Sequence, residues 1–415
     1  MTKRVRTFLV CVVALATMGL ANCGKYNCAT DDGLSFSGGS CSSGSPSGVS
    51  TGTGTTGSGS GSAFVFAGDA VGTIDSYTLS TSAGTFAATA NYTGPTAPAN
   101  ISPAGMAVAQ GLYLYAVYYE AGEIFGWTIG SDGSLTPISG SPFSASYLLN
   151  SALPGGTQTM ITNPTGTLLF LEDLGGTAIY AYQIGSGGVL KAVTSGSPVV
   201  VPGLPENLTT DGLGKYLYVT LEPSGGGFPE VGAYAIGSSG SLTAVPGSPF
   251  SYPMYQVEGD PSGKYLIGTM STSTTPTLYV FAIQQTGANG GAISAVTGSP
   301  FSTVNEPYSI AVQSNPGGDL VYSFSLGGTG SGYGGIEGYR LNTSTGALTA
   351  VSGSPFTSLD IGYLGQFDQS GAFLSVYGSG PVLGILDVGS SGALTQPIPS
   401  VDLTETGPWV ITDAN

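Results

Sequence analysis

The stretch Val231–Phe250, VGAYAIGSSGSLTAVPGSPF, decides the fold prediction because its parts recur along the chain. Its last four residues, Gly-Ser-Pro-Phe, also begin at residues 140, 298 and 353, and Gly-Ser-Pro-Val begins at residue 196. These copies are 51 to 56 residues apart. A fixed period of about 50 residues is typical of proteins built from stacked structural repeats.

The first part of the stretch, an aliphatic residue followed three positions later by an aromatic or similar side chain, predicts a strand. It occurs seven times, beginning at Ile74, Ile124, Ile179, Val231, Leu278, Ile336 and Val382. Upstream of it, an Asx turn precedes a further apolar run, as in Asp211–Val219, Asp260–Ile267 and Asn315–Tyr322. Each unit therefore holds four strands, the number in a β-propeller blade.

The two ends of the repeat region complement each other. Residues 406–413 resemble a first strand with nothing after it, whereas Ala63–Ala67 resembles a second strand with no first strand before it. Pairing them would complete one blade. We therefore predict an all-β, seven-bladed β-propeller over residues 63–415, closed by the N- and C-terminal strands.

The composition agrees with many short strands. The chain has 69 Gly and 26 Pro in 415 residues, with only 8% charged residues. Residues 1–22 have a basic start followed by an apolar run too short to span a bilayer, which predicts an export signal. Residues 23–62 are rich in Gly, Ser and Thr and are expected to form a flexible tether.

The end of the apolar run, Leu20-Ala21-Asn22-Cys23, resembles a bacterial lipobox, which predicts lipidation of Cys23. Asn22 departs from that pattern, and cleavage near residues 14–16 is the alternative. Cys28 and Cys41 then form an even pair in an oxidising compartment, consistent with a disulfide. We expect an exported protein of the bacterial cell envelope, lipid-anchored, periplasmic or surface-exposed, or a secreted one. Any membrane contact would be through the N-terminal lipid.

The chain has a net charge of −16 and no histidine. This charge argues against nucleic acid as a partner, and the missing histidine excludes Ser-His-Asp catalysis and histidine-ligated zinc. The loops that precede the first strand and follow the second strand of each unit share one face and concentrate acidic residues there. The candidates for binding a protein, glycan or cation on this acidic face are Glu120, Glu172, Asp173, Glu206, Glu222, Glu306 and Asp360. Glu172, Asp173 and Glu222 are the candidate ligands for a possible Ca²⁺.

Two passages resemble the lactonase-type seven-bladed propellers, the family of 6-phosphogluconolactonases and carboxymuconate cyclases. They are Asn163–Gly175, and Pro202–Leu208 together with Lys215–Glu222. The resemblance implies lactone hydrolysis at one face of the propeller. However, three of the family's four catalytic positions differ, with Gln158, Glu206 and Ser271 in place of the expected His, Arg and Arg. A neighbouring family histidine corresponds to Asn207, and only Glu222 is retained.

These departures favour a non-catalytic binding module that uses its acidic face. Gln158 cannot transfer a proton usefully, and Glu206 would repel an anionic substrate. Two alternatives stay open: an active lactonase or other hydrolase with a reorganised carboxylate site, and a structural scaffold in a surface assembly.

Overall fold

The computed structural model describes residues 62–68, 72–80, 85–93, 103–118, 121–145, 159–173, 176–223, 227–270, 275–325, 335–357, 364–368, 370–377, 382–397, 399–402 and 409–414. These residues are almost entirely strands and turns, with one short 3₁₀ helix, η2 (Ser186–Gly188). Residues 1–22 and the predicted tether up to residue 61, with Cys23, Cys28 and Cys41, lie outside the described residues, whereas Ser62, the last residue of the predicted tether, begins the first strand. Within the described part, no helix is long and apolar enough to cross a membrane.

The described strands form seven antiparallel sheets. Six of them are each built from consecutive strands. Three of these six are β4 (Gly105–Ala109), β5 (Tyr113–Tyr118), β6 (Glu123–Ile129) and β7 (Leu135–Pro137), with β8 (Phe143–Ser144); β9 (Met160–Thr162), β10 (Leu168–Glu172), β11 (Ala178–Ile184) and β12 (Leu190–Ala192), with β13 (Val199–Val200); and β14 (Gly203–Thr210), β15 (Tyr216–Pro223), β16 (Glu230–Ile236) and β17 (Leu242–Ala244).

The other three sheets of consecutive strands repeat the same order. They are β18 (Met254–Gly259), β19 (Tyr265–Met270), β20 (Thr277–Ile283) and β21 (Ile293–Ala295), with β22 (Phe301–Ser302); β23 (Pro307–Gln313), β24 (Asp319–Ser325), β25 (Ile336–Leu341) and β26 (Leu348–Ala350); and β27 (Leu364–Phe367), β28 (Phe373–Tyr377), β29 (Val382–Val388) and β30 (Leu394–Thr395), with β31 (Val401–Asp402).

The seventh sheet joins the two ends of the repeat region. It has the order β3 (Thr85–Thr93), β2 (Thr73–Ser80), β1 (Ser62–Gly68) and β32 (Trp409–Ala414). β1 pairs antiparallel with β32 over six residue pairs, from Ala63–Ala414 to Gly68–Trp409. The predicted pairing of the N- and C-terminal strands is confirmed.

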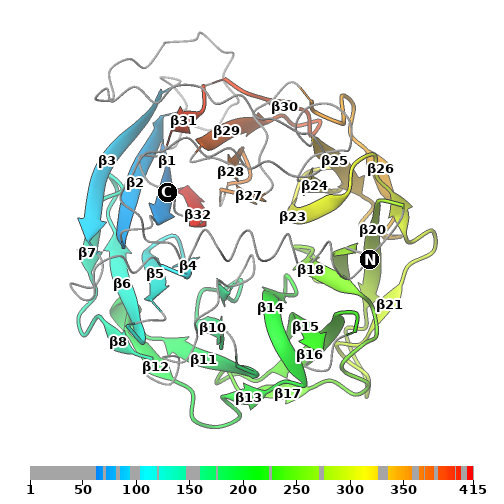
Figure 1. Cartoon of the computed structure of the whole chain (residues 1–415), viewed down its shortest axis with the longest axis horizontal. Helices are drawn as coiled ribbons and strands as arrows, with labels where there is room; N and C mark the ends of the chain where they lie inside the picture. Colours follow the sequence, from blue (N-terminus) through cyan, green and yellow to red (C-terminus); the bar gives the residue numbers. More distant parts are fainter. Residues whose placement is uncertain are drawn as a thin grey trace, which may run out of the picture. The chain divides into compact units, whose positions relative to one another are not determined.

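The first strands of the sheets contact one another in succession. β4 lies against β9, β9 against β14, β14 against β18, β18 against β23 and β23 against β27; β27 then contacts β32, and β32 contacts β4. Figure 1 labels six of these strands, β4, β14, β18, β23, β27 and β32, around the centre of the view. The all-β propeller of four-stranded antiparallel blades is confirmed.

The Gly-Ser-Pro-Phe repeat, with its Gly-Ser-Pro-Val variant, is hydrogen-bonded to the third strand in five of the seven sheets. The serine hydroxyl accepts a hydrogen bond from a backbone N–H of the third strand of its own sheet, at 2.8 Å from Ala233 to Ser248. The same bond occurs at Ser141, Ser197, Ser299 and Ser354. The Ser–Pro bond is cis in all five copies. The marker that revealed the period therefore has a structural function.

Tyrosines repeated in register tie neighbouring blades together. The buried hydroxyls of Tyr115, Tyr218 and Tyr322 donate to backbone carbonyls in the next sheet, at Gly188, Gly291 and Gly392 respectively. Each distance lies between 2.6 and 3.0 Å. The Asx turns behave as expected at Asn163, Asp211 and Asp260, whose side-chain oxygens accept backbone N–H groups of the following strand.

Candidate functional site

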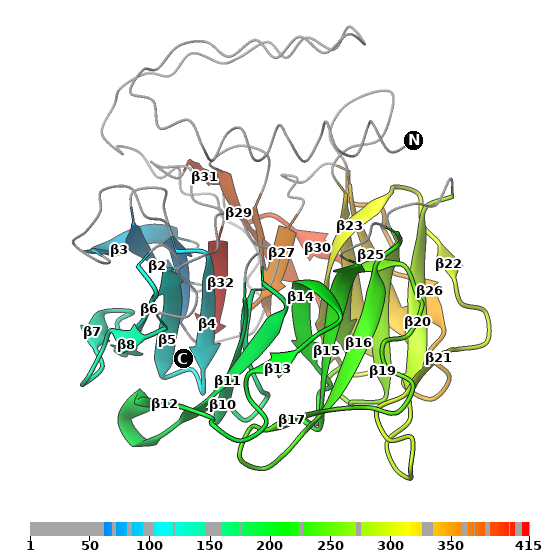
Figure 2. The ribbon, with the colours of Figure 1, turned by 60° about the horizontal axis from the view of Figure 1, so that its bottom comes forward.

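The acidic residues that precede the first strand and follow the second strand of a blade lie at the same end of the sheet. In the sheet of β14 to β17, Leu204 pairs with Glu222, whereas the turn at Asp211 lies at the opposite end. Figure 2 shows the run of β14, β15 and β16. We call the end that carries Glu222 the acidic end and the other the turn end. The predicted sorting of loops into two faces is correct for this blade.

A cluster of three carboxyl groups and two phenols forms at the acidic end. The Glu206 and Glu222 side chains are hydrogen-bonded to each other. Tyr255 lies within the electrostatic influence of Glu206, Glu222 and Glu306, and Tyr308 within that of Glu206. We call these five residues the carboxyl–tyrosine cluster. It combines side chains from three consecutive blades.

Irregularities in the first strands place the cluster. The pairing register shifts between Pro205 and Asn207 in β14, between Met254 and Gln256 in β18, and between Pro307 and Ser309 in β23. The residues skipped by these β-bulges are Glu206, Tyr255 and Tyr308. A bulge redirects a side chain out of the regular alternation of a strand. Three bulges at the same level therefore bring three side chains to one place.

Glu206 and Glu222 form a pair of interacting acids rather than two independent carboxylates. Burial of Glu206, followed by the charge of Glu222 and the hydrogen bond between them, raises the Glu206 pKa from 4.5 to about 7. A carboxyl group can donate a hydrogen bond only while it is protonated. Near neutral pH a protonated Glu206 therefore offers a donor beside the oxygen acceptors of the pair.

The residues that follow the bulges hold the first strands of adjacent blades together. Asn207 is fully buried, and its Oδ1 accepts a hydrogen bond of 2.9 Å from the Val257 N–H of β18. One blade later, the Gln256 Oε1 accepts the Ile310 N–H of β23, also at 2.9 Å. Asn207, which corresponds to a histidine in the resembled family, is therefore part of the scaffold beneath the cluster.

Glu337 of β25 orders the loop that carries Glu306 and Tyr308. Its carboxylate accepts the backbone N–H groups of Val304 and Asn305 and the hydroxyl of Tyr339, at 2.6 to 3.1 Å. Glu337 is 1% exposed, so these bonds replace the water it has lost. The direction in which the chain enters β23 therefore depends on this one buried side chain.

The other predicted site residues are not members of the carboxyl–tyrosine cluster as defined above. Glu172 ends β10 and is completely buried, and Asp173 follows it in a half-buried position. Within the described residues, no three acidic, cysteine or histidine side chains are grouped to hold a metal ion. The expectation that Glu172, Asp173 and Glu222 bind Ca²⁺ stays a prediction. Glu120, Gln158, Ser271 and Asp360 lie outside the described residues.

The sequence reasoning missed Tyr255, Tyr308 and Glu337. Tyr255 and Tyr308 occupy the same position in their strands as Glu206, namely the residue skipped by the β-bulge. An alignment of the first strands would have shown this equivalence. Nothing in the sequence around Glu337 indicates its contacts with Val304 and Asn305, which are more than 30 residues away in the chain.

The basic side chains of the described residues occupy the turn end. Lys215 and Lys264 directly follow the turns that begin at Asp211 and Asp260, and Lys191 pairs with Gln183 on an outer strand. Arg340 pairs with Thr349 near the turn at Asn315. No described cation approaches the carboxyl–tyrosine cluster, so an anionic ligand would find no partner charge there.

No protein-family model matches the chain, and no curated protein does. Solved structures resemble it in fold. A protein from Lactobacillus plantarum superimposes with a TM-score of 0.60 at 16% identity, covering 85% of this chain and 99% of its own. A proposed 6-phosphogluconolactonase from Bacteroides uniformis gives 0.60 at 13% identity, over 85% of this chain and all of its own.

A periplasmic gluconolactonase from Pseudomonas aeruginosa gives a TM-score of 0.56 at 14% identity, over 85% of this chain and 99% of its own. The chain has the fold of the lactonase-type propellers. At such low identities the likeness concerns the fold, and the fold alone does not determine an activity.

Proposed function

We propose that this protein is an exported, lactonase-like propeller that binds a neutral, hydroxyl-rich ligand such as a glycan at the carboxyl–tyrosine cluster without catalysing a reaction. In this proposal the seven sheets are the blades of one closed ring, which holds the cluster rigidly. The observation that carries the proposal is the hydrogen-bonded pair of Glu206 and Glu222, in a place where the resembled family has an arginine for an anionic substrate.

The chemistry of the cluster matches a neutral sugar. A protonated Glu206 donates, and Glu222 and Glu306 accept, so alternating donors and acceptors can meet sugar hydroxyls. Tyr308 is 42% exposed, and tyrosine rings combine an apolar face with a polar tip, as a sugar surface requires. A sugar phosphate would instead meet three acidic groups.

The export of the protein is part of the same proposal. It is supported by the basic and apolar start of the chain and by the periplasmic location of the Pseudomonas aeruginosa protein with the same fold. Lipidation of Cys23 and a disulfide between Cys28 and Cys41 complete the predicted tether. Mass spectrometry of the protein isolated from membranes would detect both modifications.

A hydrolase with a reorganised carboxylate site is the second candidate, and one observation favours it. The Glu206 pKa of about 7 is suited to proton transfer at neutral pH, and Glu222 lies within hydrogen-bonding distance. Such a pair could protonate a leaving group. The binding proposal and this candidate differ in one measurable quantity, namely turnover.

The test compares binding and turnover in the same variants. Purified protein is screened for binding to an array of neutral oligosaccharides and assayed for hydrolysis of glucono-δ-lactone. We expect saturable binding that Glu206→Ala or Tyr308→Ala weakens at least ~10-fold, the equivalent of ~1.4 kcal/mol, with no turnover. The Lys191→Gln variant, changed at the turn end, should bind like the wild type.

Two results would overturn the proposal. If no oligosaccharide binds, or if binding is the same in Glu206→Ala, the cluster is not a glycan site. If the lactone is turned over and Glu222→Gln abolishes the activity, the protein is a hydrolase.

A further inference from the structure

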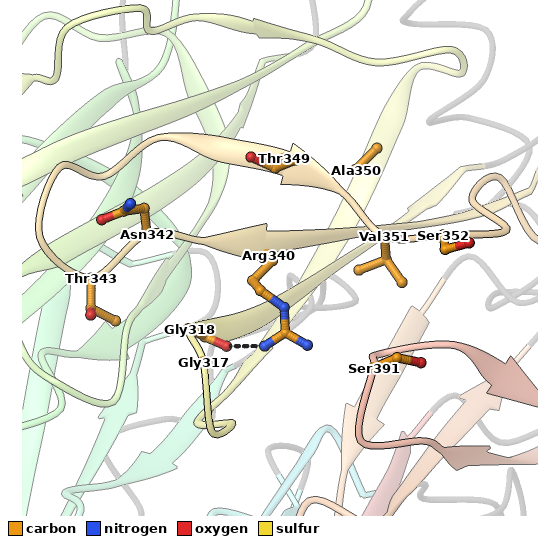
Figure 3. A pocket seen from close by; sticks show the side chains of 10 residues that line it. All are labelled: Gly317, Gly318, Arg340, Asn342, Thr343, Thr349, Ala350, Val351, Ser352 and Ser391. Atoms are coloured by element: carbon orange, nitrogen blue, oxygen red, sulfur yellow. Dashed lines mark hydrogen bonds between the residues drawn. The ribbon is translucent and has the colours of Figure 1, made fainter.

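A cavity lies at the turn end of the sheet of β23 to β26, where the next sheet adjoins it. Its volume is about 660 Å³, within the usual range for small-molecule pockets. Figure 3 shows its lining side chains. Most are polar, and they come from both sheets: Gly317, Gly318, Arg340, Asn342, Thr343, Thr349, Ala350, Val351, Ser352 and Ser391.

Arg340 lines this cavity, and its guanidinium group is held in place by hydrogen bonds to uncharged acceptors. Its Nη1 donates to the Asn315 Oδ1 at 3.1 Å, the Pro316 carbonyl at 3.3 Å and the Gly318 carbonyl at 2.8 Å. Its Nη2 donates to the Ser390 carbonyl of the next blade at 3.3 Å. In the described part of the chain no carboxylate accepts from Arg340, so its positive charge is oriented but not neutralised.

The Pro-Gly-Gly turn makes this geometry possible. Gly317 and Gly318 have φ values of 94° and 121°, and a Cβ atom at Gly318 would lie 2.6 Å from the Leu341 carbonyl oxygen. Only glycine fits there without strain. The turn thereby presents its carbonyl groups to Nη1, and the Nε–H and a second Nη2–H of Arg340 have no acceptor among the described residues.

The residues that correspond to Arg340 in other blades show that a hydrogen bond between neighbouring blades does not require a charged side chain. Gln183 pairs with Lys191 as Arg340 pairs with Thr349, and its Nε2 donates to the Ser239 carbonyl of the next blade at 3.2 Å. Ala235 occupies the position one blade later. A neutral amide, or no polar group at all, therefore satisfies the scaffold. The charge and the two remaining donors of Arg340 exceed that structural need.

The surroundings of the cavity favour one negative charge and several hydroxyls. The Lys264 Nζ donates to the Thr343 carbonyl at the rim, at 3.2 Å. Asp319 follows Gly318 but is buried, and its pKa is raised to about 6 by burial and by the charge of Asp260, against the opposing charge of Lys264. Two neighbouring donors of a guanidinium group match the two oxygens of a carboxylate. The lining Thr343, Thr349, Ser352 and Ser391 hydroxyls match a hydroxylated ligand.

We propose that this cavity is a binding site for a monoanionic, hydroxyl-rich carboxylate such as a uronate, held by the free donors of Arg340. The site is separate from the carboxyl–tyrosine cluster and does not depend on the function proposed for it. Because the protein carries a net charge of −16, long-range repulsion limits the affinity, and binding is expected in the millimolar range. A doubly charged phosphate would be repelled more strongly than a carboxylate.

The test is calorimetric titration of the full-length protein at low ionic strength with D-glucuronate, acetate, inorganic phosphate and D-glucose. We expect saturable binding of glucuronate, weaker binding of acetate, and none of phosphate or glucose. Arg340→Gln, which keeps a bridge of the Gln183 type, should lower the affinity for glucuronate at least ~10-fold. Arg340→Lys keeps the positive charge but lacks the two parallel N–H donors of the guanidinium group, so its affinity for glucuronate should be intermediate.

The Lys191→Gln variant is the matched control because it removes one positive charge from the corresponding hairpin of another blade. It should bind glucuronate like the wild type, as should Glu206→Gln. Equal binding of glucose and glucuronate, equal affinity in wild type and Arg340→Gln, or no binding by a folded wild type would overturn the proposal. Melting curves of each variant establish that it is folded.

Discussion

Replacing Glu206 by Gln should remove much of the pH dependence of this protein's stability. The folded state raises the Glu206 pKa from 4.5 to about 7, so between these values it keeps a proton that the unfolded chain releases. The stabilising contribution is complete below pH 4.5 and is lost as the pH rises through 7. A shift of this size corresponds to at most ~3 kcal/mol, less to the extent that solvent screens the half-buried Glu206 and the exposed Glu222.

The assay is urea unfolding of the propeller between pH 4.5 and 8.5. In the wild type, the free energy of unfolding should fall with increasing pH across this range. In Glu206→Gln the fall should be smaller by up to ~3 kcal/mol, and the variant should be more stable than the wild type at pH 8.5 because no second charge faces Glu222.

A second buried acid contributes in the same pH range and supplies the control. Burial, followed by the charge of Asp260, raises the Asp319 pKa from 3.8 to about 6. Its stabilising contribution is lost as the pH rises through 6. Asp319→Asn should therefore remove the decrease in the free energy of unfolding that occurs up to about pH 6 and leave the decrease above pH 6. If Glu206→Gln retains the full wild-type dependence, the Glu206–Glu222 pair does not share a proton and our reasoning is wrong.

Two further substitutions test the scaffold. Glu337→Gln should destabilise the protein by ~2–3 kcal/mol and weaken ligand binding at the cluster, because one amide oxygen cannot accept all three of the hydrogen bonds from the Val304 N–H, the Asn305 N–H and the Tyr339 hydroxyl. Glu230→Gln is the control. Unchanged urea unfolding and unchanged ligand binding in Glu337→Gln would contradict the role of Glu337. Ser248→Ala should lower the free energy of unfolding by ~1–3 kcal/mol because the Ala233 N–H loses its acceptor, whereas Ser251→Ala, which breaks only an exposed bond to Glu230, should change it by less than ~0.5 kcal/mol.

The repeats made the architecture predictable from the sequence. Each copy of the stretch around Val231–Phe250 contains local signals, namely turn residues, alternating apolar side chains and a Ser-Pro step, that act within one blade. The pairing of β1 with β32 could be inferred as well, because an incomplete unit at each end leaves a strand without a partner. The sequence also placed Glu206 and Glu222 at one end of the blades.

Only the tertiary structure decided how those acids are used. The cluster depends on bulges in β14, β18 and β23, which shift a register by one residue and leave no distinct local signature. The cluster is ordered by Glu337, whose hydrogen-bond partners Val304 and Asn305 are more than 30 residues away in the chain. Arg340 became a candidate binding group only when the structure showed that the groups accepting its hydrogen bonds are uncharged. Local sequence patterns specify turns and strands because those form between neighbours in the chain, whereas burial and proton sharing arise between residues of different blades and depend on how the blades pack.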